Sequence, residues 1–285
     1  MPTLTYPAIL SQNAILSQIL PLTLNLTQTS PHPPSLLRPL AYLTIFAFGI
    51  VIGSFLNVCI YRIPRHETVI TTPSHCMNCG YPLRWFDLIP VFSWLALRGR
   101  CRKCGERISV QYPLIEAGNG LLWVATFALC GFSVLTLLDC LAVSALLVIS
   151  LVDARTFEIP FSCNVFIGIL GIFATIFDFG HMINHIAGFF GVALLLLLVY
   201  VLTGGRGVGG GDIKLMAATG LLLGFGCNLA GFLFGCLYAS VIHIARMKLS
   251  GAESMLAMGP YLAAGTLTAI WFGERIVTWY LGFLV

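Results

Sequence analysis

Long apolar runs alternate with short polar connections along most of the chain. After a polar stretch over residues 1–39, an apolar run covers about 40–60, and a polar segment follows over 61–113. Seven further apolar runs come later, at about 114–132, 134–151, 160–177, 185–202, 213–225, 227–246 and 259–285. Runs of about 20 apolar residues are long enough to cross a bilayer as helices. The pattern predicts an all-α polytopic membrane protein with about eight transmembrane helices, a polar N-terminal tail and a small domain inserted after the first helix.

Composition agrees with this pattern and narrows the class of protein. Of 285 residues, 58% are hydrophobic and only 9% are charged, whereas a soluble domain has about 25% charged residues. The net charge of +4 is therefore better explained by membrane topology than by affinity for nucleic acid. We expect lipid as a neighbour and no nucleic-acid partner.

The cations are distributed unevenly between the two predicted sides of the membrane. With eight spans, 13 of the 15 Lys and Arg residues fall on one side, and eight of these lie within 61–113. Only Arg38 and Arg275 fall on the other side. Because basic residues collect on the cytoplasmic side, we expect the 61–113 domain in the cytoplasm and both termini outside.

Two cysteine pairs lie in the 61–113 segment. Cys76-x-x-Cys79 and Cys101-x-x-Cys104 are separated by 21 residues, and each pair has glycine nearby. This spacing is typical of a four-cysteine structural zinc site, in which four thiolates leave no position for substrate. Disulfides or redox dithiols are the alternative, but a reducing cytoplasm disfavours them. The other six cysteines lie in apolar runs and are expected to be packing residues.

A glycine-rich stretch, GGRGVGGGDIKL, covers 204–215 and connects two apolar runs. Glycine is unfavourable inside a helix, so the stretch predicts a loop, and Asp212 lies where the next helix begins. A carboxylate at the end of a membrane helix is a candidate for function. The alternative is a helix-capping aspartate after a flexible turn.

A second carboxylate, Asp153, ends the run over 134–151, and the alternation of spans places it on the same side as Asp212. Two close carboxylates resist double ionisation and share a proton, so one can act as base on a water while the other acts as acid toward a carbonyl. That is the chemistry of an aspartic peptidase. Asp139 and Asp178 fall near the opposite ends of their helices and are expected to be interfacial or packing residues. Scattered histidines at 181, 185 and 243 show no spacing typical of a nucleophile or metal set.

Over about residues 45–268 the chain resembles the prepilin peptidase family, the type IV leader peptidases among the membrane aspartic proteases. The similarity is carried by GSFLNVCIYRIP, CMNCGYPLRWFDLIPVFSWLALRGRCRKCGERISVQYPLIE, the Asp153 turn, GVGGGDIKLMAATG and MGPYLAAG. The resemblance implies that Asp153 and Asp212 are catalytic and that the substrates are prepilins and pseudopilins, cut after a glycine. It also implies a bacterial inner-membrane location and, as in many members, methylation of the new amino terminus by S-adenosylmethionine, through residues that the motifs do not identify.

Two departures from the family pattern and two rival functions accompany this interpretation. Phe161 stands where the family usually has aspartate, and Gly205 with Arg206 replaces a Lys-Glu pair before the glycines. A transporter or channel with a carboxylate proton relay is the main alternative, but it predicts acids near the bilayer midplane and repeated broken helices. A zinc-dependent assembly subunit would explain the cysteines and leave the aspartates unexplained.

Overall fold

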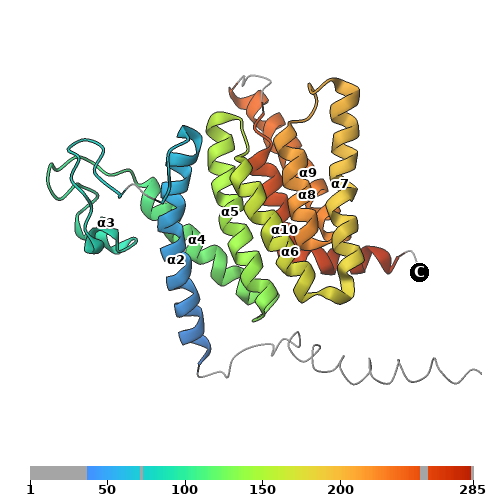
Figure 1. The fold of residues 1–285 in the computed structure, drawn as a ribbon, viewed down its shortest axis with the longest axis horizontal. Helices are drawn as coiled ribbons and strands as arrows, with labels where there is room; N and C mark the ends of the chain where they lie inside the picture. Colours follow the sequence, from blue (N-terminus) through green and yellow to red (C-terminus); the bar gives the residue numbers. More distant parts are fainter. Residues whose placement is uncertain (1–36, 71–72, 251–255, 284–285) are drawn as a thin grey trace, which may run out of the picture.

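A computed structural model describes residues 37–70, 73–250 and 256–283, so the expected polar tail lies almost wholly outside the described residues. These ranges hold eight helices of 14 residues or more, one for each predicted apolar run (Figure 1). Five of them are long and apolar enough to cross a membrane: α2, α4, α5, α7 and α9. The prediction of an all-α membrane protein is confirmed. The bounds are α2 Arg38–Arg62, α4 Gln111–Cys130, α5 Val134–Thr156, α6 Phe161–Phe177, α7 Met182–Thr203, α8 Gly210–Leu223, α9 Phe225–Ser250 and α10 Gly259–Leu281.

Glycines allow the helices to approach one another closely. A Cβ on Gly53 of α2 would lie 2.7 Å from the Cα of Glu116 in α4, and a Cβ on Gly188 of α7 would collide with the Gly220 carbonyl of α8. Small residues at helix contacts are a common means of packing in membranes, where burial of apolar surface gives little driving force. Gly53, near the end of the first predicted run, is one of these close contacts.

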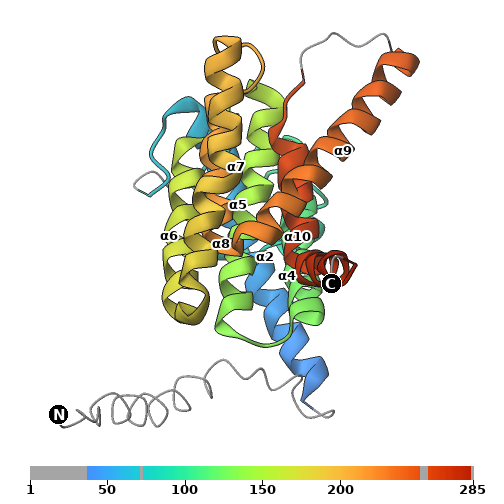
Figure 2. The same ribbon diagram turned by 90° about the vertical axis from the view of Figure 1, so that its right-hand side faces the viewer.

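Helix α8 lies at the centre of the bundle and packs against α6, α7, α9 and α10. Its Leu215 and Met216 are fully buried. Large apolar side chains such as Phe48, Phe190 and Leu233 lie exposed on the outer surfaces of α2, α7 and α9, as expected where lipid replaces water as the solvent. Towards its C-terminal end, α9 leans away from the other helices (Figure 2).

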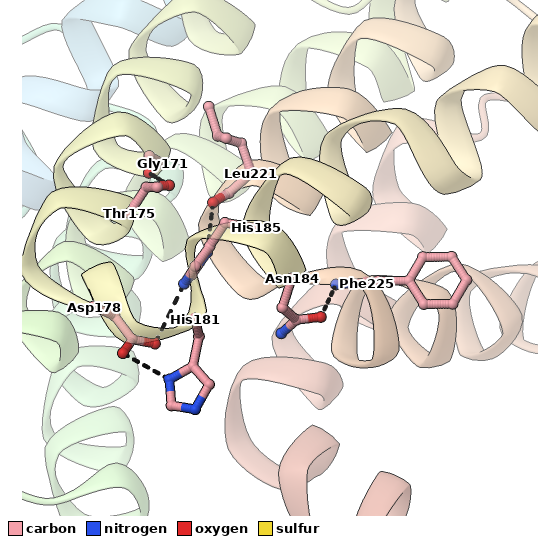
Figure 3. Close-up of polar contacts among 8 residues, drawn as sticks. All are labelled: Gly171, Thr175, Asp178, His181, Asn184, His185, Leu221 and Phe225. Carbon is pink, nitrogen blue, oxygen red and sulfur yellow. Dashed lines mark hydrogen bonds and ion pairs between the residues drawn. The ribbon is translucent and has the colours of Figure 1, made fainter. Parts of the chain in front are cut away.

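A single residue, Gly224, interrupts the helical conformation between α8 and α9, and it has a φ of +77°. Helix α7 satisfies backbone groups at this break (Figure 3). The Phe225 N–H donates to Asn184 Oδ1 at 3.1 Å, and His185 Nδ1 donates to the Leu221 carbonyl at 2.9 Å. A helix break within a membrane protein is tolerated where neighbouring side chains supply such bonds.

The polar segment between α2 and α4 contains the short elements η1 Ile63–Arg65, η2 Trp85–Leu88 and α3 Phe92–Ala96. In Figure 1 it lies beside the end of the bundle where α2 finishes and α4 begins. Its aromatic residues differ in burial: Phe86 and Trp94 are half-buried, whereas Trp85 and Phe92 are exposed.

Candidate active site and metal centre

Asp153 lies in the last turn of α5 and is buried, with 4% of its surface exposed. Its Oδ2 accepts a hydrogen bond of 2.8 Å from the N–H of Gly259, the first residue of α10. Helix N-termini carry unsatisfied N–H groups and a partial positive charge, so they stabilise a carboxylate. The beginning of α10 thus holds Asp153 in place, and a Cβ on Gly259 would lie 2.7 Å from Asp153 Oδ2.

Asp212 occupies the third position of α8 and is half-buried. Its Oδ2 accepts the N–H of Gly209, the residue that caps the helix, at 3.2 Å. The alternative interpretation of Asp212 as the N-cap residue is therefore wrong: Gly209 is the N-cap, and Asp212 bonds back to it from the third helical position. This bond occupies one oxygen with a backbone donor and leaves the carboxylate able to act on a second group.

The structure brings these two aspartates together, as the sequence predicts. They are near enough for the charge of Asp153 to act on Asp212. The turn after α5 also meets the start of α8, where a Cβ on Gly211 would lie 3.0 Å from Ile159 Cβ. Asn164 of α6 donates to the Gly211 carbonyl at 3.4 Å.

Within the described residues, neither aspartate has an ion pair or a hydrogen bond from a side chain. The nearby cations have other partners: Arg155 donates to Gln111 at 2.5 Å, and Lys214 lies 5.1 Å from the ring centroid of Phe161. Phe161, where the chain departs from the family pattern, therefore lies beside Lys214. Two adjacent carboxylates without a cation favour a shared proton.

The four cysteines of the polar segment also come together, with all four sulfur atoms within 4.8 Å of one another. The two halves of the cluster have matching backbone turns. The backbone carbonyl of Cys76 accepts the N–H of Gly80 at 2.9 Å, and the carbonyl of Cys101 accepts the N–H of Gly105 at 3.0 Å. Both glycines have positive φ. The cluster can hold a metal ion, and its thiol-only ligand set suits zinc.

Backbone donors favour the thiolate form of Cys101, one member of this cluster. The N–H groups of Cys104 and Lys103 lower the pKa of the Cys101 thiol to about 6. A thiolate is the form that binds metal. Of the cysteines expected to be packing residues, Cys59, Cys140 and Cys163 are buried among apolar side chains.

Sequence reasoning missed a polar cluster at the opposite end of the bundle, which Figure 3 shows. Asp178 Oδ1 lies 2.8 Å from His181 Nδ1, and Asp178 Oδ2 lies 3.4 Å from His185 Nε2. The available signal was the spacing of three, then four residues, which puts side chains on one face of a helix. This cluster lies far along α6 and α7 from the aspartate pair and is not part of the candidate active site.

Together the fold and the site define a polytopic membrane protein with an acid pair at one end, the arrangement that an intramembrane aspartic peptidase requires. Comparison with known proteins agrees. Residues 47–130 match the bacterial peptidase A24 N-terminal domain, and residues 140–244 match the type IV leader peptidase family. The chain belongs to the type IV leader peptidase family, and the alternative of a transporter or channel is not supported.

Several relatives carry the name prepilin leader peptidase/N-methyltransferase. One from Bacillus subtilis is 32% identical over 243 residues, which cover 83% of this chain and 96% of the relative. One from Myxococcus xanthus is 32% identical over 224 residues, covering 76% of this chain and 67% of the relative. One from Neisseria gonorrhoeae is 29% identical over 281 residues, covering 87% and 97%. No solved structure matches the chain.

Proposed function

We propose that this protein removes the leader peptide from type IV prepilins and type II secretion pseudopilins, cutting after a glycine at the cytoplasmic face of the bacterial inner membrane. One observation carries the proposal. Carboxylates from α5 and α8 meet at one end of the bundle, and no side chain of the described residues pairs with either.

Asp153 and Asp212 have complementary roles in this proposal. When the pair holds one proton, the ionised carboxylate takes a proton from a water, and the protonated one donates to the carbonyl oxygen of the scissile peptide. The assignment of base and acid belongs to the pair rather than to either residue. Glycines before Asp212 let an extended substrate, with glycine before the cut, pass close to the loop.

The location of the pair at a helix-bundle end suits a membrane-anchored precursor. A substrate with its own apolar helix is held by the bilayer at one depth, so aspartates at the boundary reach the bond just outside that helix. The test is incubation of purified enzyme with a prepilin, read by mass spectrometry. Loss of the leader mass supports the proposal, and an intact precursor under conditions where the enzyme is folded contradicts it.

We assign residues 61–113 to a cytoplasmic metal-binding domain and residues 114–285 to the peptidase domain, after a tail at 1–39 and a first helix at 40–60. The cation distribution supports this orientation. Single-cysteine labelling in intact cells tests it. Labelling of a cysteine in 61–113 by a reagent that cannot enter cells would contradict the orientation.

The four-cysteine cluster is proposed to hold one structural zinc ion. A segment of about 50 residues has little core of its own, so a metal would supply much of its stability. Replacing Cys76 by serine should remove the metal from purified protein, whereas Cys130→Ser, in α4, should leave one zinc per chain. A full zinc content in the Cys76 variant would contradict the assignment.

Methylation of the new amino terminus is the second proposed activity, and it needs S-adenosylmethionine. When bound, this donor would supply a methyl group from its sulfonium: the free amine would form the new N–C bond and release a proton to solvent, while the C–S bond would break and leave its electron pair on sulfur as a thioether. Labelled donor in the same incubation tests this half separately, because cleavage without label transfer would leave a peptidase only.

A further inference from the structure

A cavity of about 570 Å³ lies between the polar segment and the ends of α2 and α4. This volume is large enough for a small-molecule ligand, since sites for drug-sized ligands span about 300–1,000 Å³. Residues of all three elements line it, and the aspartate pair does not. The lining residues used below are Ser54, Asn57, Val58, Trp94, Tyr112 and Glu116.

Asn57 of α2 presents a buried acceptor with no donor. Its residue surface is 5% exposed, and its Nδ2 donates to the carbonyls of Gly53 at 3.4 Å and Tyr112 at 3.2 Å. These bonds set the orientation of the amide, and Oδ1 has no hydrogen-bond partner among the described residues. A buried acceptor without a donor costs about 1–3 kcal/mol, so the wall of the cavity contains hydrogen-bonding capacity that the described residues leave unused.

Glu116 of α4 is a second buried acceptor beside the cavity, with 7% of its surface exposed. It accepts the Val91 N–H at 2.7 Å and the hydroxyl of Ser54. Val91 has a φ of +63°, which is strained for a β-branched residue. The polar segment therefore adopts an unfavourable conformation to hold this carboxylate with a backbone donor, and no described cation forms an ion pair with it.

An aromatic side chain, Trp94, lines the same cavity. Trp94 is fixed by a hydrogen bond of 3.2 Å from Nε1 to the Ile108 carbonyl. Gly99 packs against its ring, since a Cβ there would lie 2.8 Å from the ring carbon Cζ2. A fixed aromatic face suits stacking of a planar base and contact with a cation.

We propose that this cavity is the binding site for S-adenosylmethionine, an inference that rests on the methyl-transfer half of the proposed function. The donor is cationic at sulfur and rich in N–H and O–H groups, and the Glu116 carboxylate, the Trp94 ring and the Asn57 side chain line the cavity. The lining carries four acids against three arginines, so it is slightly acidic, and it fits the ligand in hydrogen-bonding type and in size.

The position of the cavity suits a second reaction on the same product. Asn57 bonds to Tyr112 in the first turn of α4, and the preceding residue, Gln111, accepts from Arg155, two residues beyond Asp153. Cavity and aspartate pair therefore share one end of the bundle. An amino terminus released at the aspartates can move along the membrane boundary to the methyl donor without crossing the bilayer.

Equilibrium binding of labelled S-adenosylmethionine to the full-length protein, without prepilin, tests the site. We expect saturable binding that weakens at least tenfold in Glu116→Gln, which removes the charge, and in Val58→Phe, which fills the cavity. Glu158→Gln provides a matched control because this acid is exposed outside the cavity. Zinc content and prepilin cleavage by the same preparations report whether each variant is folded.

The outcomes separate this inference from the proposed function. Unchanged donor affinity in both folded cavity variants would overturn the inference, as would an enzyme that cleaves prepilin and does not bind the donor. Weaker prepilin affinity with donor binding intact would also overturn it and assign the cavity to the leader peptide. Donor binding that depends on the cavity, in a protein that fails to cleave prepilin, would support the site and contradict the peptidase proposal.

Discussion

Carboxylates occupy both ends of the helix bundle, and they are held in different ways. At one end, each oxygen of Asp178 faces a histidine, His181 or His185. At the other end, Asp153 and Asp212 each accept one backbone N–H and lie near enough for the charge of one to act on the other. The first arrangement stabilises a charge by pairing it. The second leaves two acids to compete for one proton, which is the condition for acid–base chemistry.

The largest effect on prepilin cleavage is expected when either unpaired acid is removed. Asp153→Asn and Asp212→Asn should each lower the rate of prepilin cleavage by about 10²–10⁴-fold, because either change removes the acid or the base. Asp178→Asn, at the paired end, should retain most of the rate. Initial rates with thermal unfolding as the folding check would measure this. Near-normal cleavage by a folded Asp153 or Asp212 variant would end the aspartic interpretation.

A smaller loss is expected when the support of Asp153 is disturbed. Gly259→Ala places a Cβ against Asp153 Oδ2, and a displacement of about 1 Å can cost about 10²-fold in rate. Gly180→Ala is the control near the paired end, because a Cβ there meets nothing within 4 Å. Steady-state cleavage rates provide the measurement. Equal rates in the two variants would show that Asp153 does not depend on the start of α10.

At the paired end, stability rather than cleavage should change. His185 is buried and bonds to the Leu221 carbonyl, so His185→Phe leaves that carbonyl without its donor and should cost about 1–3 kcal/mol in unfolding free energy. Denaturant titration in detergent would measure it. A variant that unfolds normally and yet fails to cleave prepilin would contradict the structural role of this end.

The smallest effect is expected for the exposed partner of Asp178. The His181 side chain is 73% exposed, and surface pairs contribute about 0–1 kcal/mol. His181→Ala should therefore unfold almost as the unmodified protein does in the same titration. A loss as large as that in His185→Phe would mean that the pair with His181, rather than the bond to the helix break, holds the end together.

Much of this architecture could be predicted from the sequence, for identifiable reasons. Eight apolar runs correspond to eight helices because hydropathy is a local property. The meeting of Asp153 with Asp212 followed from counting spans, since alternation puts both at one end. The roles of these aspartates and of the four cysteines stay predictions, although the structure places each group together.

Other features could not be predicted because they depend on tertiary contacts. Asp153 and its donor Gly259 are 106 residues apart, and no local pattern links them. The pairing of Asp178 with His185 requires the exact turn between α6 and α7. The orphan oxygen of Asn57 is visible only once α2, α4 and the polar segment are placed together.

Because α8 ends at the fixed break at Gly224, the number of residues in α8 determines the direction in which Asp212 points. Helix α8 has 14 residues, about 21 Å at a rise of about 1.5 Å per residue. Hydrogen bonds with α7 hold its C-terminal end. One inserted residue between Asp212 and Gly224 would turn the aspartate by about 100° around the helix axis and away from Asp153. Insertions in the loop before Gly209 would leave that angle unchanged. The two sides of Asp212 thus differ in how they tolerate a change of length.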